Sequence, residues 1–429
     1  MIATVVTTEA SKERKSTLRA ALGPGLVMAG AAIGVSHLVQ STRAGAEYGL
    51  ALLALVLVGC IVRYPFLEFG PRYAAATGEH LIAGYRRLGR WPIAIFAFIT
   101  LSTMFIVLAS VTLVTAGLTG ALFGLDLPVS VIALAILSLC GAILVLGHYR
   151  GLDLIMKIIM AFLAVATLSA VGLAAGQEAD WSRLAPAWND TRLVSGAGLA
   201  FMLALLGWMP IPLDAAAWHS LWTLERARAT GRRPSVEHAG FDFAVGYLGA
   251  TLMALAFVLL GALTLYGSGR VLPDSAVQFT TTLLEMYSTG LGEWSRGLIA
   301  FAALATMIST TLTVADAYPR VLQALAEQSL ATSHRRNVYL GGLALVLTGA
   351  WLTIWLLGHQ FTLLIDLTTT VAFLAAPVIA WLNYRLLTSR HTPAAARPGT
   401  GMRLLSWIGL AFLTAFSLTW LIWRLFGMD

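Results

Sequence analysis

The chain has 429 residues, of which 58% are hydrophobic and only 11% are charged, and its formal net charge is +7. A soluble domain is usually about a quarter charged, so this composition excludes a soluble globular protein and indicates an integral membrane protein. The lipid bilayer is therefore the first expected partner. The positive charge accompanies no nucleic-acid-binding motif, and the two cysteines have no CxxC or Cys/His spacing. No nucleic-acid partner, zinc site, disulfide or cofactor is predicted.

Apolar runs long enough to cross a bilayer recur along almost the whole chain, since about 20 helical residues span about 30 Å of hydrocarbon. Residues 1–20 are polar and charged, and we expect them to form a cytoplasmic tail. Residues 21–426 are predicted to form a single transmembrane domain that is all-α, because backbone groups in lipid must be satisfied internally. The eleven predicted spans are 21–43, 47–69, 92–122, 127–147, 153–175, 195–222, 241–267, 296–325, 337–357, 360–385 and 402–426.

Lys and Arg concentrate in alternate connecting segments. If the N-terminus lies inside, nineteen of the 28 fall on the inner side and six on the outer side. Positive loops are retained in the cytoplasm, so we predict an N-terminus inside and a C-terminus outside the cell (inner) membrane. Arg63, Lys157 and Arg403 fall near predicted span ends and are assigned to neither side.

A long polar connector, 223–240, follows the sixth span and divides the spans into five, five and one. This plan is typical of transporters with inverted repeats, in which broken helices place a binding site near the midplane. We therefore predict a LeuT-like fold of the APC superfamily. Repeat one would cover about 21–175, repeat two about 195–385, and an extra helix 402–426.

Helix-breaking residues cluster in the first helix of each predicted half. Span six contains Gly207, Pro210 and Pro212 within the stretch GWMPIP. Each proline removes a backbone donor and clashes with the preceding turn, so this helix is predicted to be discontinuous. Span one contains Gly30 and Gly34, which permit unwinding. Paired interruptions at these positions favour a transporter.

Several motifs resemble the Nramp family of proton-coupled divalent-metal transporters, in order and spacing and over nearly the whole chain. They are GPG at 23–25, AGAEYG at 44–49, RYAAATGEHL at 72–81 and WHS at 218–220. The family motif Asp-Pro-Gly-Asn would fall on Gly34, Val35, Ser36 and His37, so its Asp is missing and its Asn is His. The family motif Met-Pro-His would fall on Pro212, Leu213 and Asp214, without the Met sulfur.

The resemblance also implies a second histidine five residues later, which is retained as His219, and acidic residues on span three, which are missing. It therefore implies the scaffold of the family with an altered metal site. Loss of the sulfur argues against a site tuned to soft transition metals. Because span three lacks acids, protons are expected to be weakly coupled or not coupled at all.

Asp214 is the main candidate for binding a substrate. A carboxylate at a helix break in lipid is costly unless it faces a cavity, a partner or an ion. His37 is its expected partner, as a metal ligand or a donor, and Gln40 is expected to share its side of the helix. Both residues also have a structural interpretation, in which they fix helix packing. Gly34, Met209 and Pro212 complete the predicted substrate-binding set; Asp214 and His37 are its metal candidates.

Two further residues are predicted to serve a proton or gating path. His219 lies one to two turns past Asp214, and Asp366 is a carboxylate within span ten. A packed structural histidine is an equal alternative for His219. The hydroxyls of Thr306, Ser309, Thr310 and Thr313 are expected mainly to bond their own helix or a neighbouring one.

Two functions remain open from the sequence. The first is a secondary transporter of a small cation, such as a divalent metal, with selectivity altered from that of Nramp. The alternative is a transporter of a small organic solute, such as an amino acid, whose carboxylate would bind at a half-helix N-terminus. A sensor or scaffold would need a signalling domain that the sequence does not contain. An enzyme is not expected, since no nucleophile and base or phosphate loop has a credible spacing.

Overall fold

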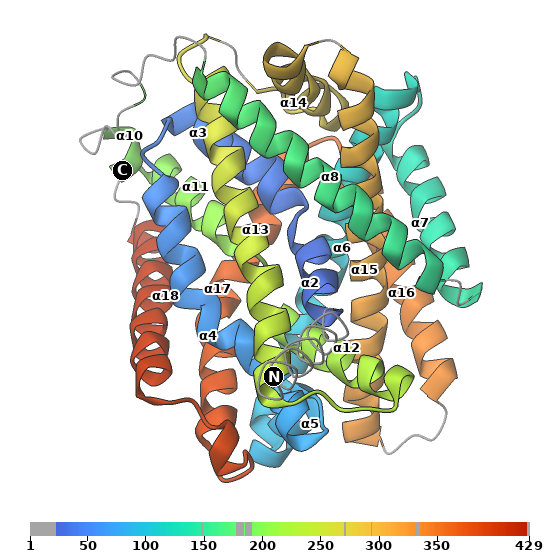
Figure 1. Ribbon diagram of the computed structural model, residues 1–429, viewed down its shortest axis with the longest axis vertical. Helices are drawn as coiled ribbons and strands as arrows, with labels where there is room; N and C mark the ends of the chain where they lie inside the picture. The colour runs from blue at the N-terminus through green and yellow to red at the C-terminus, as the bar shows by residue number, and fades with distance from the viewer. Residues whose placement is uncertain are drawn as a thin grey trace, which may run out of the picture.

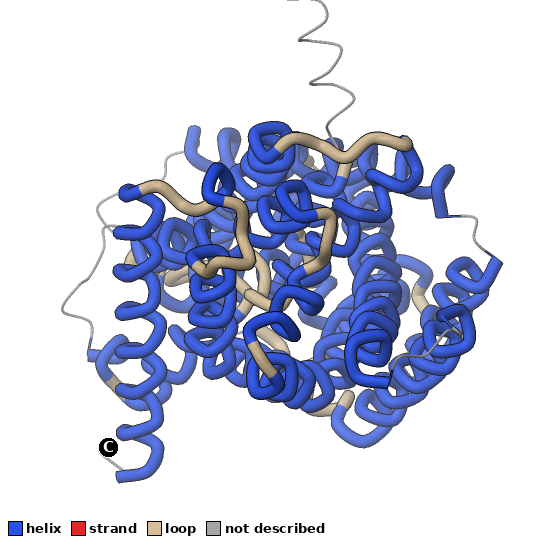
Figure 2. Tube along the Cα trace, turned by 90° about the horizontal axis from the view of Figure 1, so that it is seen from below, coloured by secondary structure: helices blue, strands red, loops and turns tan. Residues whose placement is uncertain are grey.

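The computed structural model describes residues 23–146, 149–176, 184, 191–269, 272–292, 294–330 and 335–426. The predicted tail, 1–20, lies outside these ranges. Every regular element within them is a helix, and Figure 2 accordingly shows helices and loops only. The predicted all-α class is therefore confirmed for the part of the chain that is described.

Apolar runs in the first half of the chain form helices close to the predicted limits. In order, the elements are α2 (Pro24–Ala32), the π-helical turn η1 (Ser36–Ser41), α3 (Thr42–Tyr48), α4 (Leu53–Thr77), α5 (Leu81–Leu88), α6 (Arg90–Phe123), α7 (Val129–Leu146) and α8 (Tyr149–Gly176). The predicted first span is thus divided among α2, η1 and α3 (Figure 1).

The second half begins with another divided span. Its elements are α10 (Thr191–Val194), α11 (Gly196–Gly207), α12 (Ala215–Thr230), α13 (Val236–Thr264), α14 (Ala276–Leu291), α15 (Trp294–Leu330), α16 (Arg335–Leu357), α17 (Phe361–Thr388), the 3-10 turn η2 (Ala394–Ala396) and α18 (Thr400–Phe426). Two of these helices, α10 and α14, were not predicted. Both lie at the upper end of the molecule in Figure 1. The short helix α5, at the lower end, was also not predicted.

The predicted count of eleven spans is not confirmed. Among the described residues, eight helices are long and apolar enough to cross a membrane, and α2 with η1 and α3 forms a ninth, bent span. The apolar helix Gly196–Gly207 is shorter than a full span. For Gly196–Gly207 the reason is the interruption after Gly207, which divides the predicted sixth span.

The broken helices lie inside the bundle. Helix α13 packs against α2, η1, α3 and α4, and α15 packs against α2, α6 and α16. The peripheral surfaces expose large apolar side chains, including Phe98 at 71%, Leu248 at 63% and Leu404 at 62%. Exposed apolar faces on such long helices are what contact with lipid requires. The centre of the bundle is thus the place where polar groups are enclosed by protein.

Candidate functional site

Helix one is interrupted between α2 and η1. The two segments are bent by 46° relative to each other, and the interruption contains Ile33 and Gly34. Thr310 of α15 fills this break, because its hydroxyl donates to the carbonyl of Gly30 at 2.8 Å. A π-helical turn within a helix is rare and is frequent at functional sites. The predicted break in helix one is therefore confirmed, and it contains a partner from another helix.

His37 belongs to η1 and is fully buried against α13. Its Nε2 atom lies 2.9 Å from the carbonyl oxygen of Ala250, and its Nδ1 atom lies 2.9 Å from the hydroxyl of Ser36. Both ring nitrogens are thus engaged within the protein. His37 could bind a metal only if one of these contacts were lost. The geometry is that of a residue fixing the packing of helix one.

The second break separates α11 from α12. Residues 208–214 are non-helical and buried, as the prolines in this stretch predict. Gly207, at the end of α11, approaches the backbone of α17 so closely that a Cβ atom would lie 2.0 Å from the carbonyl oxygen of Thr369. The predicted discontinuity of helix six is confirmed.

The two breaks lie beside each other. Helix α2 packs against α12, and η1 packs against α11. The hydroxyl of Ser41 lies 3.9 Å from the sulfur of Met209, which links the first break to the second. Met209 is fully buried, so its thioether lies between the two broken helices.

Asp214 directly precedes α12 and is 7% exposed. Together with Pro212, it lines a small cavity of about 10 Å³, which is enough for about one water molecule. The other walls of this cavity come from α6 and α17: Ile99, Thr103, Val107, Ala372, Ala375 and Ile379. The side chains of Tyr318, Arg63 and Tyr85, from other helices, interact with it. His37 is not among them.

Gln40 and Asp366 meet at the other end of the first break. The amide of Gln40 donates to Asp366 at 2.8 Å, and Arg43 donates to the same carboxylate oxygen at 2.7 Å. Gln40 therefore faces α17, whereas His37 faces α13, because the π-helical turn alters the spacing of side chains around the axis. These contacts connect helix one with α17.

An open pocket of about 760 Å³ lies beyond this ion pair. Its lining includes Arg43, Glu47, Arg192 and Asp274. It lies at the end of the molecule that carries α3 and α14 (Figure 1). Arg43, one partner of the Arg43–Asp366 pair, thus forms part of the wall of this vestibule.

His219 lies on α12, between the second break and the opposite end of the molecule. Its side chain is 1% exposed and stacks against Phe243, with ring centroids 5.8 Å apart. Neither ring nitrogen has a hydrogen-bond partner among the described residues. It makes no recorded contact with Asp214, so the structure does not join the two into one site.

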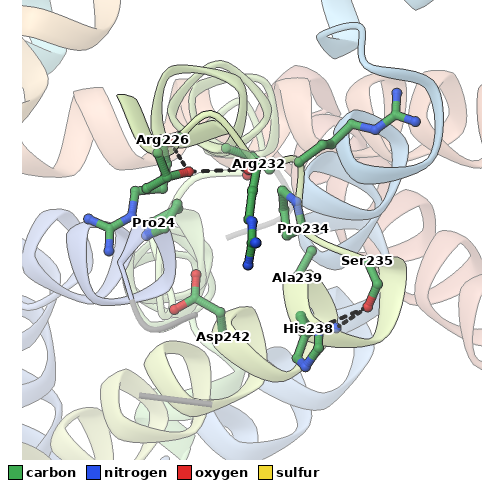
Figure 3. A pocket seen from close by; sticks show the side chains of 11 residues that line it. Pro24, Arg226, Arg232, Pro234, Ser235, His238, Ala239 and Asp242 are labelled. Atoms are coloured by element: carbon green, nitrogen blue, oxygen red, sulfur yellow. Dashed lines mark hydrogen bonds between the residues drawn. The ribbon is translucent and has the colours of Figure 1, made fainter. Parts of the chain in front are cut away.

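The lower end of helix one is held by a carboxylate. Asp242 of α13 accepts hydrogen bonds from the amides of Gly23 and Gly25, at 2.9 and 2.7 Å. Asp242 also lines a pocket of about 240 Å³. In Figure 3, Arg232 points toward Asp242 across this pocket, and Arg226 lies on another wall. The GPG motif is therefore the place where α13 anchors the start of α2.

Arg63 is a site residue that the sequence prediction missed. It was placed near the end of a predicted span, but the structure shows it within α4, 1% exposed, at the second break. Its guanidinium donates to the carbonyls of Gly207 and Met209, at 3.1 and 3.2 Å. A charge within an apolar run was the signal available, since intramembrane charges are seldom idle.

The hydroxyls of α15 mostly bond their own helix, as predicted. Thr306 donates to the carbonyl of Ala302 and Thr313 to that of Ser309, each at 2.8 Å. Thr310 also reaches the carbonyl of Thr306 on its own helix, at 3.1 Å, in addition to that of Gly30. Across the described residues, no group of three His, Cys, Asp or Glu side chains is placed to hold a metal ion.

An all-helical membrane bundle with two adjacent broken helices has the LeuT-like fold that the sequence predicts. Two solved structures share this fold at low sequence identity. A manganese transporter of Eremococcus coleocola has a TM-score of 0.70 and 14% identity, covering 94% of this chain and 86% of that one. Mhp1, a nucleobase-cation-symport-1 family transporter, has a TM-score of 0.58 and 14% identity, covering 94% and 93%.

Sequence comparison identifies the family. The family model for natural resistance-associated macrophage protein-like (Nramp) proteins matches residues 25–423. An uncharacterised protein of Pasteurella multocida is 33% identical over 423 residues, covering 97% of this chain and 95% of the relative. A divalent metal cation transporter of Verminephrobacter eiseniae is 23% identical over 430 residues, covering 98% and 93%. The chain belongs to the Nramp family, as the motifs in its sequence indicated.

Proposed function

We propose that the protein is a secondary active transporter that moves a small divalent cation across the membrane by alternating access. Family membership supports the transporter class, and relatives named as divalent metal cation transporters support the cation. The observation that carries the proposal is Asp214, a buried carboxylate beside a cavity at the break between α11 and α12. Broken helices of this kind supply backbone carbonyls and dipoles to a bound ion.

The proposed site combines Asp214 with carbonyl groups at the two breaks. Pro212 lines the same cavity, and the Met209 sulfur lies between the broken helices. With a single carboxylate, the site suits a weakly held or partly hydrated cation, and its selectivity would differ from that of a site with several charged ligands. Gly34 would serve by allowing helix one to be interrupted beside this site.

The remaining predicted residues have proposed roles outside the ligand shell. His37 would hold helix one against α13. Gln40 and Asp366, with Arg43, would form a gate toward the vestibule, and His219 would lie on the path toward the opposite side. These assignments follow from the contacts of each side chain.

A small organic solute is the alternative raised by the sequence. The relatives named as metal cation transporters extend over as much as 98% of this chain and favour the cation. The nucleobase–cation symporter has the lower TM-score of the two structures described above and shares the fold alone. The cation is therefore the proposed substrate.

The proposed arrangement in the membrane follows the charge bias of the loops. The protein would lie in the cell (inner) membrane with the N-terminus in the cytoplasm and the C-terminus outside. The vestibule lined by Arg43 and Glu47 would then open to the outside. Repeats at about 21–175 and 195–385 would form one transmembrane domain with an extra helix at 402–426.

Uptake into proteoliposomes tests the function. We expect vesicles containing the protein to accumulate Mn²⁺ or Mg²⁺ and not amino acids. Asp214→Asn should lower cation uptake at least about 100-fold, because it removes the charge at the break. The control is Asp316→Asn, which changes a carboxylate paired with Arg320 at 2.6 Å, away from the break. Amino-acid uptake without cation uptake would contradict the proposal.

A pH-sensitive dye in the same vesicles tests coupling to protons. Residues 92–122 contain no Asp or Glu. We therefore expect little or no acidification when the cation is added. Strong acidification that depends on the cation would contradict this expectation.

A further inference from the structure

Arg63 is a buried charge at the second helix break, and the proposed ion path does not use it. It lies in α4, and its side chain is among the largest that are fully buried. An arginine guanidinium keeps its charge even when it is buried. Its position must therefore be stabilised by groups of opposite polarity.

The groups that stabilise Arg63 are backbone carbonyls. One guanidinium nitrogen, Nη1, donates to the carbonyl of Gly207 at 3.1 Å and to that of Met209 at 3.2 Å. The last carbonyls of a helix have no partner within the helix and carry a partial negative charge. In transporters with broken helices, such carbonyls coordinate the transported cation. Arg63 thus lies where a cation would be held.

The remaining contacts of Arg63 are incomplete. Its Nε and Nη2 atoms have no hydrogen-bond partner in the described part of the chain. Its charge lies 5.6 Å from the ring centre of Phe373 and interacts with the charge of Asp214. No ion pair within 4 Å joins Arg63 to Asp214 among the described residues. A buried charge with incomplete hydrogen bonds is costly, because the loss of its hydration is only partly compensated.

We propose that Arg63 is a tethered cation that occupies the carbonyl subsite of the transported ion and determines its affinity and selectivity. This inference rests on the proposed function. When the ion binds beside Asp214, the guanidinium leaves the carbonyls of Gly207 and Met209. With Asp214 and Arg63 both present, the empty site is neutral, so a cation must compete with a charge that the protein itself supplies. Such a site binds divalent cations weakly and rejects those that coordinate carbonyls poorly.

Calorimetric titration of Mn²⁺ into the purified full chain tests the proposal. Arg63→Gln removes the competing charge and should raise the Mn²⁺ affinity at least about tenfold, because a like charge a few ångströms away strongly opposes a divalent ion at low dielectric. Arg63→Lys keeps the charge and should change the affinity less than about threefold. The control is Arg72→Gln, on the same helix, whose guanidinium is paired with Glu68. It should leave the affinity unchanged.

A second variant tests the same subsite without relying on Arg63→Gln. In Arg63→Ala, free guanidinium ion in the low millimolar range should raise the melting temperature and weaken Mn²⁺ binding. It should do neither in the wild-type protein, where the subsite is already filled. Displacement of Mn²⁺ by guanidinium would support the tethered cation directly.

The outcomes separate this inference from the proposed function. If the wild type binds Mn²⁺ and folded Arg63→Gln binds it no more tightly, Arg63 is not a competitor and this inference alone is overturned. If the wild type and all variants bind no divalent cation, the proposed function fails. If neither neutral variant folds, with or without guanidinium, the fold needs Arg63 in place at all times. That result also overturns the inference, because the guanidinium must leave the carbonyls during transport.

Discussion

The two helix breaks differ in how fully their polar groups are satisfied. At the first break, Thr310 bonds the carbonyl of Gly30, and both ring nitrogens of His37 have partners. At the second break, two nitrogens of Arg63 have no hydrogen-bond partner within the described ranges, and the indole nitrogen of Trp208 has none either. Buried polar groups are normally paired, so unpaired ones need an explanation.

The difference supports placing the proposed ligand at the second break. A break whose polar groups all have hydrogen-bond partners, which we call saturated, is a fixed structural element. A ligand entering it would have to displace existing hydrogen bonds. An unsaturated break with a carboxylate can gain interactions when an ion or water enters. We therefore assign substrate binding mainly to the second break and positioning to the first.

The largest expected effect comes from filling space at the second break. In Gly207→Ala the new Cβ atom would lie 2.0 Å from the carbonyl oxygen of Thr369, so α11 and α17 must move apart. We expect a loss of at least about 2 kcal/mol of stability, despite the better helix propensity of Ala. The melting temperature of the purified protein measures this loss.

The matched variant at the first break is Gly34→Ala. Its Cβ atom would lie 3.0 Å from the methyl group of Thr310, which is the end of a side chain and can shift. We expect a change of less than about 1 kcal/mol. Equal losses in the two variants would remove the contrast between the breaks.

The sequence predicted the architecture because hydrophobic length and proline chemistry act locally. Pro210 and Pro212 break a helix wherever they lie within it, and residues 92–122 form one long helix, α6, as their apolar run predicts. The carboxylate of Asp214 could be placed at the break for the same reason. Its burial and its cavity agree with that placement.

The partners of these residues could not be predicted, because they depend on which helices pack together. His37 was expected beside Asp214, but its ring faces α13, which begins about 200 residues later in the chain. Gln40 was expected to follow His37, and the π-helical turn instead directs it to Asp366. Arg63 went unrecognised because a charge near the end of a predicted span resembles a residue that reaches the membrane surface.

A smaller effect is expected from His37 itself. In His37→Phe the hydrogen bond from helix one to the carbonyl of Ala250 would be lost, while that carbonyl keeps its partner within α13, so the loss should cost about 0.5–1.5 kcal/mol. Because His37 belongs to the saturated break, the affinity for Mn²⁺ should change less than about threefold. Thermal unfolding and calorimetric titration of the same sample measure the two quantities.

The matched variant is His219→Phe. This histidine is equally buried, but its ring nitrogens have no partner within the described chain and it already stacks on Phe243. We expect no loss of stability, since no hydrogen bond is broken. If His37→Phe weakened Mn²⁺ binding more than about tenfold, the first break would supply a ligand and our assignment would be wrong.

The smallest expected effect concerns the ion pair between helix one and α17. Arg43 and Asp366 are joined at 2.7 Å, with side chains 12% and 34% exposed. A double-mutant cycle with Arg43→Gln and Asp366→Asn should give a coupling energy of about 1 kcal/mol in thermal stability. The exposed pair Arg228–Glu225, at 3.4 Å, is the control and should give a coupling near zero.

If this pair is a gate, its loss should also admit reagents from the vestibule. Ser36 lies two turns below Arg43 and is 3% exposed, while both native cysteines are buried. Ser36→Cys should therefore react slowly with a water-soluble thiol reagent, and faster when Arg43→Gln is added. The rate should return toward the slow value when a divalent cation is bound, because an occupied second break holds helix one and α17 together. An unchanged rate in the double variant would mean that the ion pair fastens the two helices without controlling access between them.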